Sequence, residues 1–156
     1  MRPPIPTGSD GLDELLSGGL AAETMHLLYG EAETGKTTLA LQCAVNCAKM
    51  GFKTIYIDSE GTFSAKRLTQ IASGTVQEVA PNVILAKPAT FKEQTSILDK
   101  LDAYLTKKVG LVVVDTITAL YSAELGGTSK ETFKLNRELN RQMACLAQIV
   151  KTRKVT

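Results

Sequence analysis

A phosphate-binding loop is predicted by nine consecutive residues: Gly30, Glu31, Ala32, Glu33, Thr34, Gly35, Lys36, Thr37 and Thr38. The glycines at the first and sixth positions allow the main chain to curl tightly, so that successive N–H groups point at an anion. At this spacing Lys36 reaches the β- and γ-phosphates of a nucleotide, and the Thr37 hydroxyl ligates Mg²⁺. We therefore expect ATP with Mg²⁺ as the ligands, and Lys36 as a contributor to the chemistry.

Two glutamates, Glu31 and Glu33, occupy variable positions of this loop. Because main-chain N–H groups form the phosphate cradle, side chains at these positions can point away from the ligand. Their repulsion of phosphate costs about 1 kcal/mol or less each at the dielectric of a protein surface. We expect them to weaken nucleotide binding without abolishing it.

Two further carboxylates follow apolar segments that have the pattern of buried strands. Asp115 ends the run GLVVVD and is expected to hold Mg²⁺ together with Thr37. Asp58 and Glu60 end the run KTIYIDSE, and a carboxylate there can activate a water for attack on the terminal phosphate. Glu60 lies further out along the chain, so we assign it the catalytic role.

The segments around these residues alternate in pattern. Near-continuous apolar runs predict parallel strands, and amphipathic stretches between them predict helices, which together indicate an α/β fold. The predicted strands cover residues 24–30, 53–60, 82–88 and 111–116. The predicted helices cover residues 9–16, 37–50, 64–73, 91–105 and about 129–151, and a polar loop covers 123–131.

Composition is typical of one globular domain, with 44% hydrophobic and 22% charged residues among 156. No apolar run approaches the length of a membrane span and no signal peptide is recognisable, so we expect a cytoplasmic protein without a membrane partner. The three cysteines, Cys43, Cys47 and Cys145, lie in helical patterns, whereas the single histidine, His26, lies in a different segment with a strand-like pattern. This arrangement favours buried, reduced thiols over a zinc site.

The last predicted helix has two contrasting faces. Leu135, Leu139, Met143, Leu146 and Val150 form an apolar line, and Lys130, Lys134, Arg137 and Arg141 form a basic one. Residues 129–156 hold seven Lys or Arg against two Glu, whereas the rest of the chain is mildly acidic. The basic line fits weak, non-specific DNA binding, and equally fits an ordinary solvated face.

Nearly the whole chain resembles one family in its motifs: PTGSDGLDELLSGGL, GEAETGKTT, YIDSEGTFSAKRL, VVVDTITALYSAELGG and LNRELNRQMACLAQIVKTRK. In this order they are similar to the ATPase core of RecA-type recombinases of the archaeal and eukaryotic branch, and within it to a short archaeal paralogue. The resemblance implies a three-layer αβα core over residues 1–156, weak ATPase activity, and DNA binding in repair and recombination. It also implies regulation of a RadA-type recombinase, or of a structure-specific nuclease, rather than strand exchange.

By the same resemblance Glu60 matches the catalytic glutamate, Lys36, Thr37 and Asp115 match the phosphate and magnesium residues, and Arg67 matches an arginine that packs on adenine. Residues 124–130 match the first DNA-binding loop, although Lys130 is its only cation.

The sequence departs from the family in two ways. It has neither an N-terminal helical domain nor a Phe-x-x-Ala linking motif, so we expect no filament and leave a homodimer open. It also stops where the family continues with another strand and a second DNA-binding loop, so we expect the core to be incomplete. Two alternatives remain: a KaiC-like signalling ATPase, and an ATP-gated adaptor that binds a protein partner without significant hydrolysis.

Overall fold

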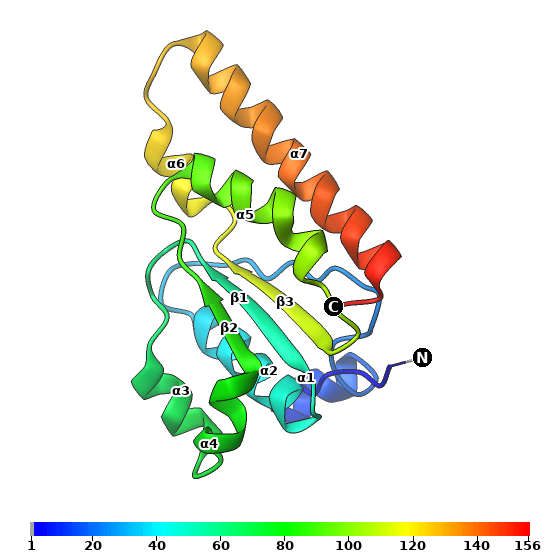
Figure 1. The fold of residues 1–156 in the computed structure, drawn as a ribbon. Helices are drawn as coiled ribbons and strands as arrows, with labels where there is room; N and C mark the ends of the chain where they lie inside the picture. Colours follow the sequence, from blue (N-terminus) through cyan, green and yellow to red (C-terminus); the bar gives the residue numbers. More distant parts are fainter. Residues whose placement is uncertain (1) are drawn as a thin grey trace.

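The computed structural model describes residues 2–156 and shows a parallel sheet between two layers of helices (Figure 1). The strands are β1 (Lys53–Asp58), β2 (Val83–Ala86) and β3 (Val109–Asp115), in the order β2-β1-β3. The predicted α/β class is confirmed, and three of the four predicted strands form within a few residues of their expected bounds.

Five of the helices agree with the sequence pattern. They are α1 (Asp10–Leu15), α2 (Lys36–Lys49), α3 (Ala65–Ala72), α5 (Phe91–Tyr104) and α7 (Ser129–Arg153). The pattern missed α4 (Val76–Val79), the 3₁₀ turn Ala80–Asn82 and α6 (Ala119–Glu124), because elements of three to six residues are too short to show a period. The polar loop expected at 123–131 is shorter than predicted, because α6 includes its first two residues and α7 includes its last three.

Apolar side chains of β1 alternate between two clusters, one on each side of the sheet. Tyr56 faces a cluster from α2, α3 and α4 that includes Leu41, Val45, Leu68 and Val79. Ile55 and Ile57 face the opposite cluster, which α5 and α7 supply with residues that include Leu98, Leu101 and Ile149. The period of two along β1 therefore separates the layer that carries the phosphate loop from the layer that carries the basic helix.

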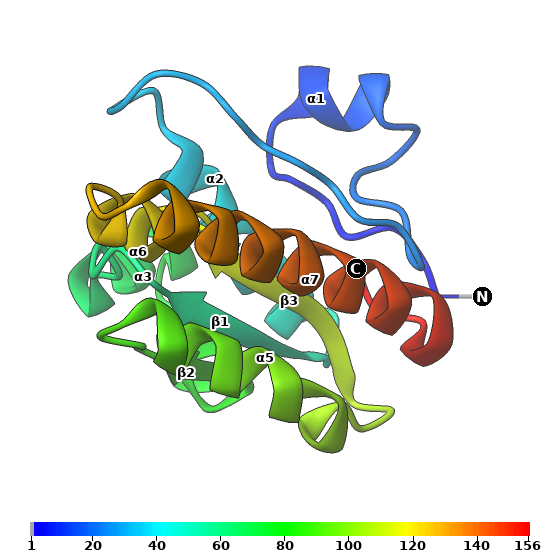
Figure 2. The ribbon, with the colours of Figure 1, turned by 90° about the horizontal axis from the view of Figure 1, so that it is seen from above.

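The strand predicted for residues 24–30 does not form, and the prediction was wrong on this point. These residues are exposed, with 69% of the surface of Leu27 and 85% of that of Tyr29 accessible. A strand needs a hydrogen-bonded neighbour. On the side of β3 away from β1, Thr156 takes up main-chain hydrogen-bonding groups that a further strand would use: its N–H donates to the Gly110 carbonyl, and its carbonyl accepts from the Val112 N–H. The segment instead arches away from the body before it enters α2 (Figure 2).

Helix α7 begins at a capping box, in which the Thr128 hydroxyl accepts from the Glu131 N–H and the Glu131 carboxylate accepts from the Thr128 N–H. It packs against α5 through polar contacts as well as apolar ones. The side chains of Gln94 and Gln142 are buried and joined by a hydrogen bond of 2.8 Å, and Gln94 also donates to the Ile117 carbonyl after β3.

The predicted apolar line of α7 is only partly buried. On α7, Val150 is buried, whereas the other members of the line are half-buried: Leu135, Leu139, Met143 and Leu146. The reason is that α7 meets α5 through a neighbouring face that carries Glu138, Gln142 and Cys145.

Candidate functional site

The phosphate loop connects the arching segment to α2. Residues 30–35 are exposed, and Gly35 has φ = 93°, a left-handed conformation that glycine adopts without strain. Helix α2 begins at the next residue, Lys36, so the loop lies at the positive end of a 14-residue helix. The end of the loop thus has a left-handed glycine followed directly by the start of a helix, as the motif predicts.

Lys36 lies across the mouth of this loop. Its ammonium donates to the carbonyl of Gly30 at 3.0 Å and to that of Glu31, and it lies 3.5 Å from the Thr34 hydroxyl. These three acceptors hold the cation where the loop closes on itself. A phosphate at the loop would take over those hydrogen bonds with a full negative charge, which is a stronger partner than a carbonyl.

The two loop glutamates differ in backbone conformation. Both side chains are exposed, as expected for residues that point away from a main-chain cradle. Glu33 has φ = 62°, a left-handed conformation that costs a residue with a Cβ roughly 1–2 kcal/mol. The sequence did not reveal this strain, because the motif allows any residue at position 33.

Two of the predicted site residues, Glu60 and Asp115, lie at the neighbouring tips of β1 and β3. Asp58 and Asp115 are partners in register, and the Asp115 carbonyl accepts from the Ser59 N–H at 2.9 Å and from the Glu60 N–H at 3.3 Å. Glu60 itself is exposed, so its carboxylate is available to solvent and ligand. Glu60 and Asp115 thus lie at the same edge of the sheet, at the carboxyl ends of neighbouring strands.

Asp58 has a different environment from Glu60. It is 1% exposed, and its carboxylate accepts from the N–H groups of Thr62 at 3.0 Å and Phe63 at 3.1 Å. Lys87, after β2, places its ammonium 3.7 Å from the same carboxylate. Asp58 therefore holds the turn that carries Glu60, which leaves Glu60 as the carboxylate free to meet a water.

Asp115 has a partner that the sequence did not reveal. The phenol of Tyr56 donates to Asp115 Oδ2 at 2.8 Å, and the Tyr56 side chain is fully buried. Burial, together with the neighbouring carboxylate, raises the pKa of Tyr56 far above its usual value, so the phenol keeps its proton. Tyr56 belongs to the same buried cluster as Leu41 and Ala44 of α2, so the carboxylate that it bonds lies on the side of the sheet that α2 covers.

The donor chemistry fits Mg²⁺ in the presence of a nucleotide. Residues 2–156 contain no group of three or more His, Cys, Asp or Glu side chains that could hold a metal ion. Magnesium, however, is usually bound by one or two protein oxygens together with phosphate and water oxygens. The Thr37 hydroxyl and the Asp115 carboxylate are hard oxygen donors of the required kind, one at the start of α2 and one on the strand tip beside it.

Arg67, expected to pack on adenine, is exposed on α3, the helix that packs beside α2. Its main-chain N–H is bonded to the capping hydroxyl of Ser64 at 3.3 Å. The guanidinium makes no hydrogen bond or ion pair within residues 2–156. The structure thus places Arg67 on the layer of the phosphate loop with its side chain uncommitted.

The four basic residues of α7 are not equivalent. Arg141 makes ion pairs at 2.8 Å with Asp99 on α5 and with Glu138, so two carboxylates balance its charge. Lys130, Lys134 and Arg137 are exposed and have no ion-pair partner among the residues that the structure describes. The part of the basic face that remains free is therefore the N-terminal half of α7, which projects beyond the sheet (Figure 1).

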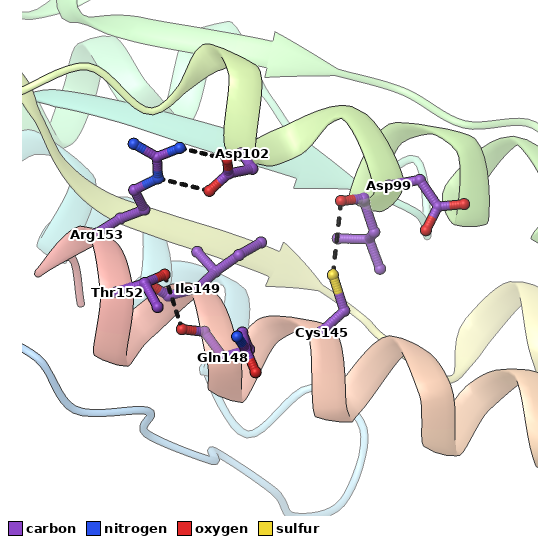
Figure 3. Close-up of a pocket in the computed structure, with 8 residues that line it drawn as sticks. Asp99, Asp102, Cys145, Gln148, Ile149, Thr152 and Arg153 are labelled. Carbon is purple, nitrogen blue, oxygen red and sulfur yellow. Dashed lines mark hydrogen bonds and ion pairs between the residues drawn. The ribbon is translucent and has the colours of Figure 1, made fainter.

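A shallow groove of about 440 Å³ lies between α5 and α7 (Figure 3). These helices cover the face of the sheet opposite α2 and the phosphate loop. Arg153 pairs with Asp102 along the groove, and the Cys145 thiol lies 3.9 Å from the Leu98 carbonyl. None of the predicted site residues lines this groove. Of the cysteines, Cys43 and Cys47 are buried as expected, and Cys145 is half-buried.

Comparison with known proteins identifies the family of this chain. The family model described as Rad51 matches residues 4–156. The chain belongs to the Rad51 family. The resemblance that the sequence motifs indicated is therefore confirmed for this Rad51-family chain at the level of the family.

Relatives of this Rad51-family chain include archaeal proteins named DNA repair and recombination protein RadB. The chain is 40% identical over 145 residues to the one from Thermococcus onnurineus, 38% over 144 residues to the one from Methanococcoides burtonii, and 34% over 140 residues to one from Methanococcus maripaludis. These alignments cover 91%, 92% and 90% of the chain, and 61%, 63% and 64% of the respective relatives. The chain thus spans a little under two thirds of their length.

No helix in residues 2–156 has both the length and the apolar character that crossing a membrane requires.

Proposed function

We propose that this protein binds ATP with Mg²⁺, hydrolyses it slowly, and acts in DNA repair and recombination as a regulatory paralogue. The observation that supports the proposal most is the meeting of Glu60 and Asp115 at neighbouring strand tips, on the sheet edge beside α2. A phosphate loop alone is compatible with simple binding, whereas hydrolysis also needs a carboxylate that is free to orient a water. Glu60 is exposed and Asp58 is not, so the two carboxylates of that turn have separate tasks.

The roles of the site residues follow from their chemistry. Main-chain N–H groups of residues 30–38 bind the phosphates, and Lys36 compensates the charge on the β- and γ-phosphates. Thr37 and Asp115 would hold Mg²⁺, which neutralises charge on the phosphates when it is bound. Glu60 takes a proton from the attacking water, and Arg67 stacks on the adenine.

We propose that DNA is bound weakly and without sequence preference by Lys130, Lys134 and Arg137. Arg141 was expected in this set, but Asp99 and Glu138 already balance its charge, so it contributes less. Three free cations on one helix face suit phosphate contacts, which depend strongly on salt.

The partner that we propose is a RadA-type recombinase or a structure-specific nuclease in the cytoplasm, with regulation rather than strand exchange as the outcome. The names of the relatives from three archaea support recombination over a KaiC-like signalling role. An adaptor that binds ATP without significant hydrolysis is distinguished from the enzyme by the experiment that follows.

Two variants separate binding from hydrolysis. Glu60→Gln should bind a fluorescent ATP analogue as tightly as the wild type, and should lower turnover by roughly a hundredfold or more, as expected for the loss of a general base. Lys36→Ala should weaken binding itself. Turnover is measured by phosphate release with Mg²⁺, in the presence and absence of single-stranded DNA. Unchanged turnover in Glu60→Gln would refute the catalytic assignment, and undetectable turnover in the wild type would favour the adaptor.

A further inference from the structure

Tyr56 occupies a position that its hydrophobic surroundings alone do not explain. The side chain is fully buried in the cluster between the sheet and α2, and Phe63 contacts its ring edge-on at a centroid distance of 5.3 Å. A phenylalanine would fill the same space. The hydroxyl, however, needs a hydrogen-bond partner in an apolar environment, and its partner is Asp115 at 2.8 Å.

The hydrogen bond reaches one oxygen of the carboxylate only. Tyr56 donates to Asp115 Oδ2, and Oδ1 accepts no hydrogen bond from residues 2–156. Tyr56 pairs in register with Val113 on β3, so its side chain reaches diagonally along the sheet to the residue two positions further on. One carboxylate oxygen is therefore held from inside the protein, and the other has no hydrogen-bond donor among the residues that the structure describes.

We propose that Tyr56 is a positioning residue for the magnesium ligand Asp115. By donating to Oδ2, the phenol fixes the rotamer of Asp115 and leaves Oδ1 for the metal. Phe63 in turn fixes the tilt of the phenol ring. The proposal rests on the proposed function, because it assigns Tyr56 a part in metal binding at that same site. Partners of this kind, which contact a ligand rather than the metal, typically change metal affinity by about 10–100-fold.

The test compares Tyr56→Phe with the wild type in Mg²⁺ titrations of a bound fluorescent ATP analogue. The variant removes one oxygen atom and keeps the ring. We expect the Mg²⁺ concentration at half-maximal effect to rise about tenfold or more. Affinity for the analogue in excess EDTA should stay within about twofold, because the phosphate loop is untouched. Tyr104→Phe is the matched control, since Tyr104 is exposed on α5 and should leave both quantities unchanged.

A variant that retains Tyr56 keeps the inference testable if Tyr56→Phe folds poorly, and a double variant tests whether Tyr56 acts through Asp115. Phe63→Leu retains the hydroxyl but removes the ring that orients it, and should shift the Mg²⁺ requirement in the same direction by a smaller factor. Combining Tyr56→Phe with Asp115→Asn should add nothing to the shift that Asp115→Asn causes alone, because Tyr56 acts through that carboxylate. Additive shifts would overturn the inference.

The outcomes separate this inference from the proposed function. If the wild type binds the analogue with Mg²⁺ dependence and Tyr56→Phe has the same midpoint, the positioning role is wrong and the proposed function stands. If wild-type binding does not depend on Mg²⁺ at all, the magnesium assignment of the proposed function is wrong, and the role of Tyr56 is refuted with it.

Discussion

The amide N–H of Glu60 lies 3.3 Å from the main-chain carbonyl of Asp115 and donates to it across the tips of two neighbouring strands. The same carbonyl accepts from Ser59 at 2.9 Å, so β1 and β3 remain joined beyond their last ladder partners. The residue proposed to activate water and the residue proposed to hold the metal are therefore connected through the main chain. The distance between their main-chain positions is therefore set by the geometry of the sheet.

Replacement of Glu33 tests why carboxylates occur in the phosphate loop. Glu33→Gly removes both the left-handed strain at φ = 62° and the charge, whereas Glu33→Gln removes only the charge. We expect Glu33→Gly to bind ATP between equally and about tenfold more tightly, because loss of the repulsion contributes about 1 kcal/mol or less and a loop without left-handed strain adjusts more easily to the phosphates. Glu33→Gln should show the smaller gain. Calorimetric titration at low salt measures both. A large loss of affinity in both variants would instead reveal a direct contact of this carboxylate with the ligand.

Charge reversal on α7 tests the proposed DNA contacts. Lys134→Glu combined with Arg137→Glu should weaken binding to single-stranded DNA and reduce the slope of log affinity against log salt by about one for each phosphate that the helix no longer neutralises. The matched control reverses Lys92 and Lys100, two exposed lysines on α5, and alters net charge by the same amount. Fluorescence anisotropy at several salt concentrations gives the slopes. If both double variants lower affinity equally, net charge explains the binding and the face has no special role.

The pH dependence of stability should carry a contribution from Asp13 near the N-terminus. The Thr7 main-chain N–H and the Thr7 hydroxyl both donate to its carboxylate at 2.7 Å, and these bonds lower the pKa of Asp13 below its usual 3.8. A carboxyl group whose pKa is lowered by folding stabilises the folded state above the usual pKa, and that contribution is lost as the pH falls through the folded-state pKa. Asp13→Asn should therefore be less stable than the wild type at neutral pH.

The difference in unfolding free energy between the wild type and Asp13→Asn should narrow below about pH 4, where the carboxyl group of Asp13 becomes protonated in the unfolded state. Thermal unfolding followed by circular dichroism from neutral to acidic pH measures it. A difference that stayed constant over this range would show that Asp13 acts through its shape and not through its charge.

Local features of this site were predictable from the sequence, and contacts between distant segments were not. Lys36, Thr37 and Gly35 are placed by a loop and a helix start that are continuous in sequence, so spacing alone sufficed. The strand expected at residues 24–30 failed because strand formation depends on a neighbour, which an apolar run does not reveal. The bond from Tyr56 to Asp115 and the pairing of Arg141 with Asp99 join residues 59 and 42 positions apart, and no sequence period links them.

The buried amide pair of Gln94 and Gln142 limits how α7 can move. Amide hydrogen bonds are directional, so a shift of one residue along the helix, which turns its faces by about 100°, would leave both side chains buried without partners. Gln94 also donates to the carbonyl of Ile117, just beyond β3. The rotation of α7 about its axis, and with it the direction of its lysines, is therefore fixed relative to the end of β3. A polyanion that binds along α7 therefore meets cations whose direction relative to the sheet is fixed.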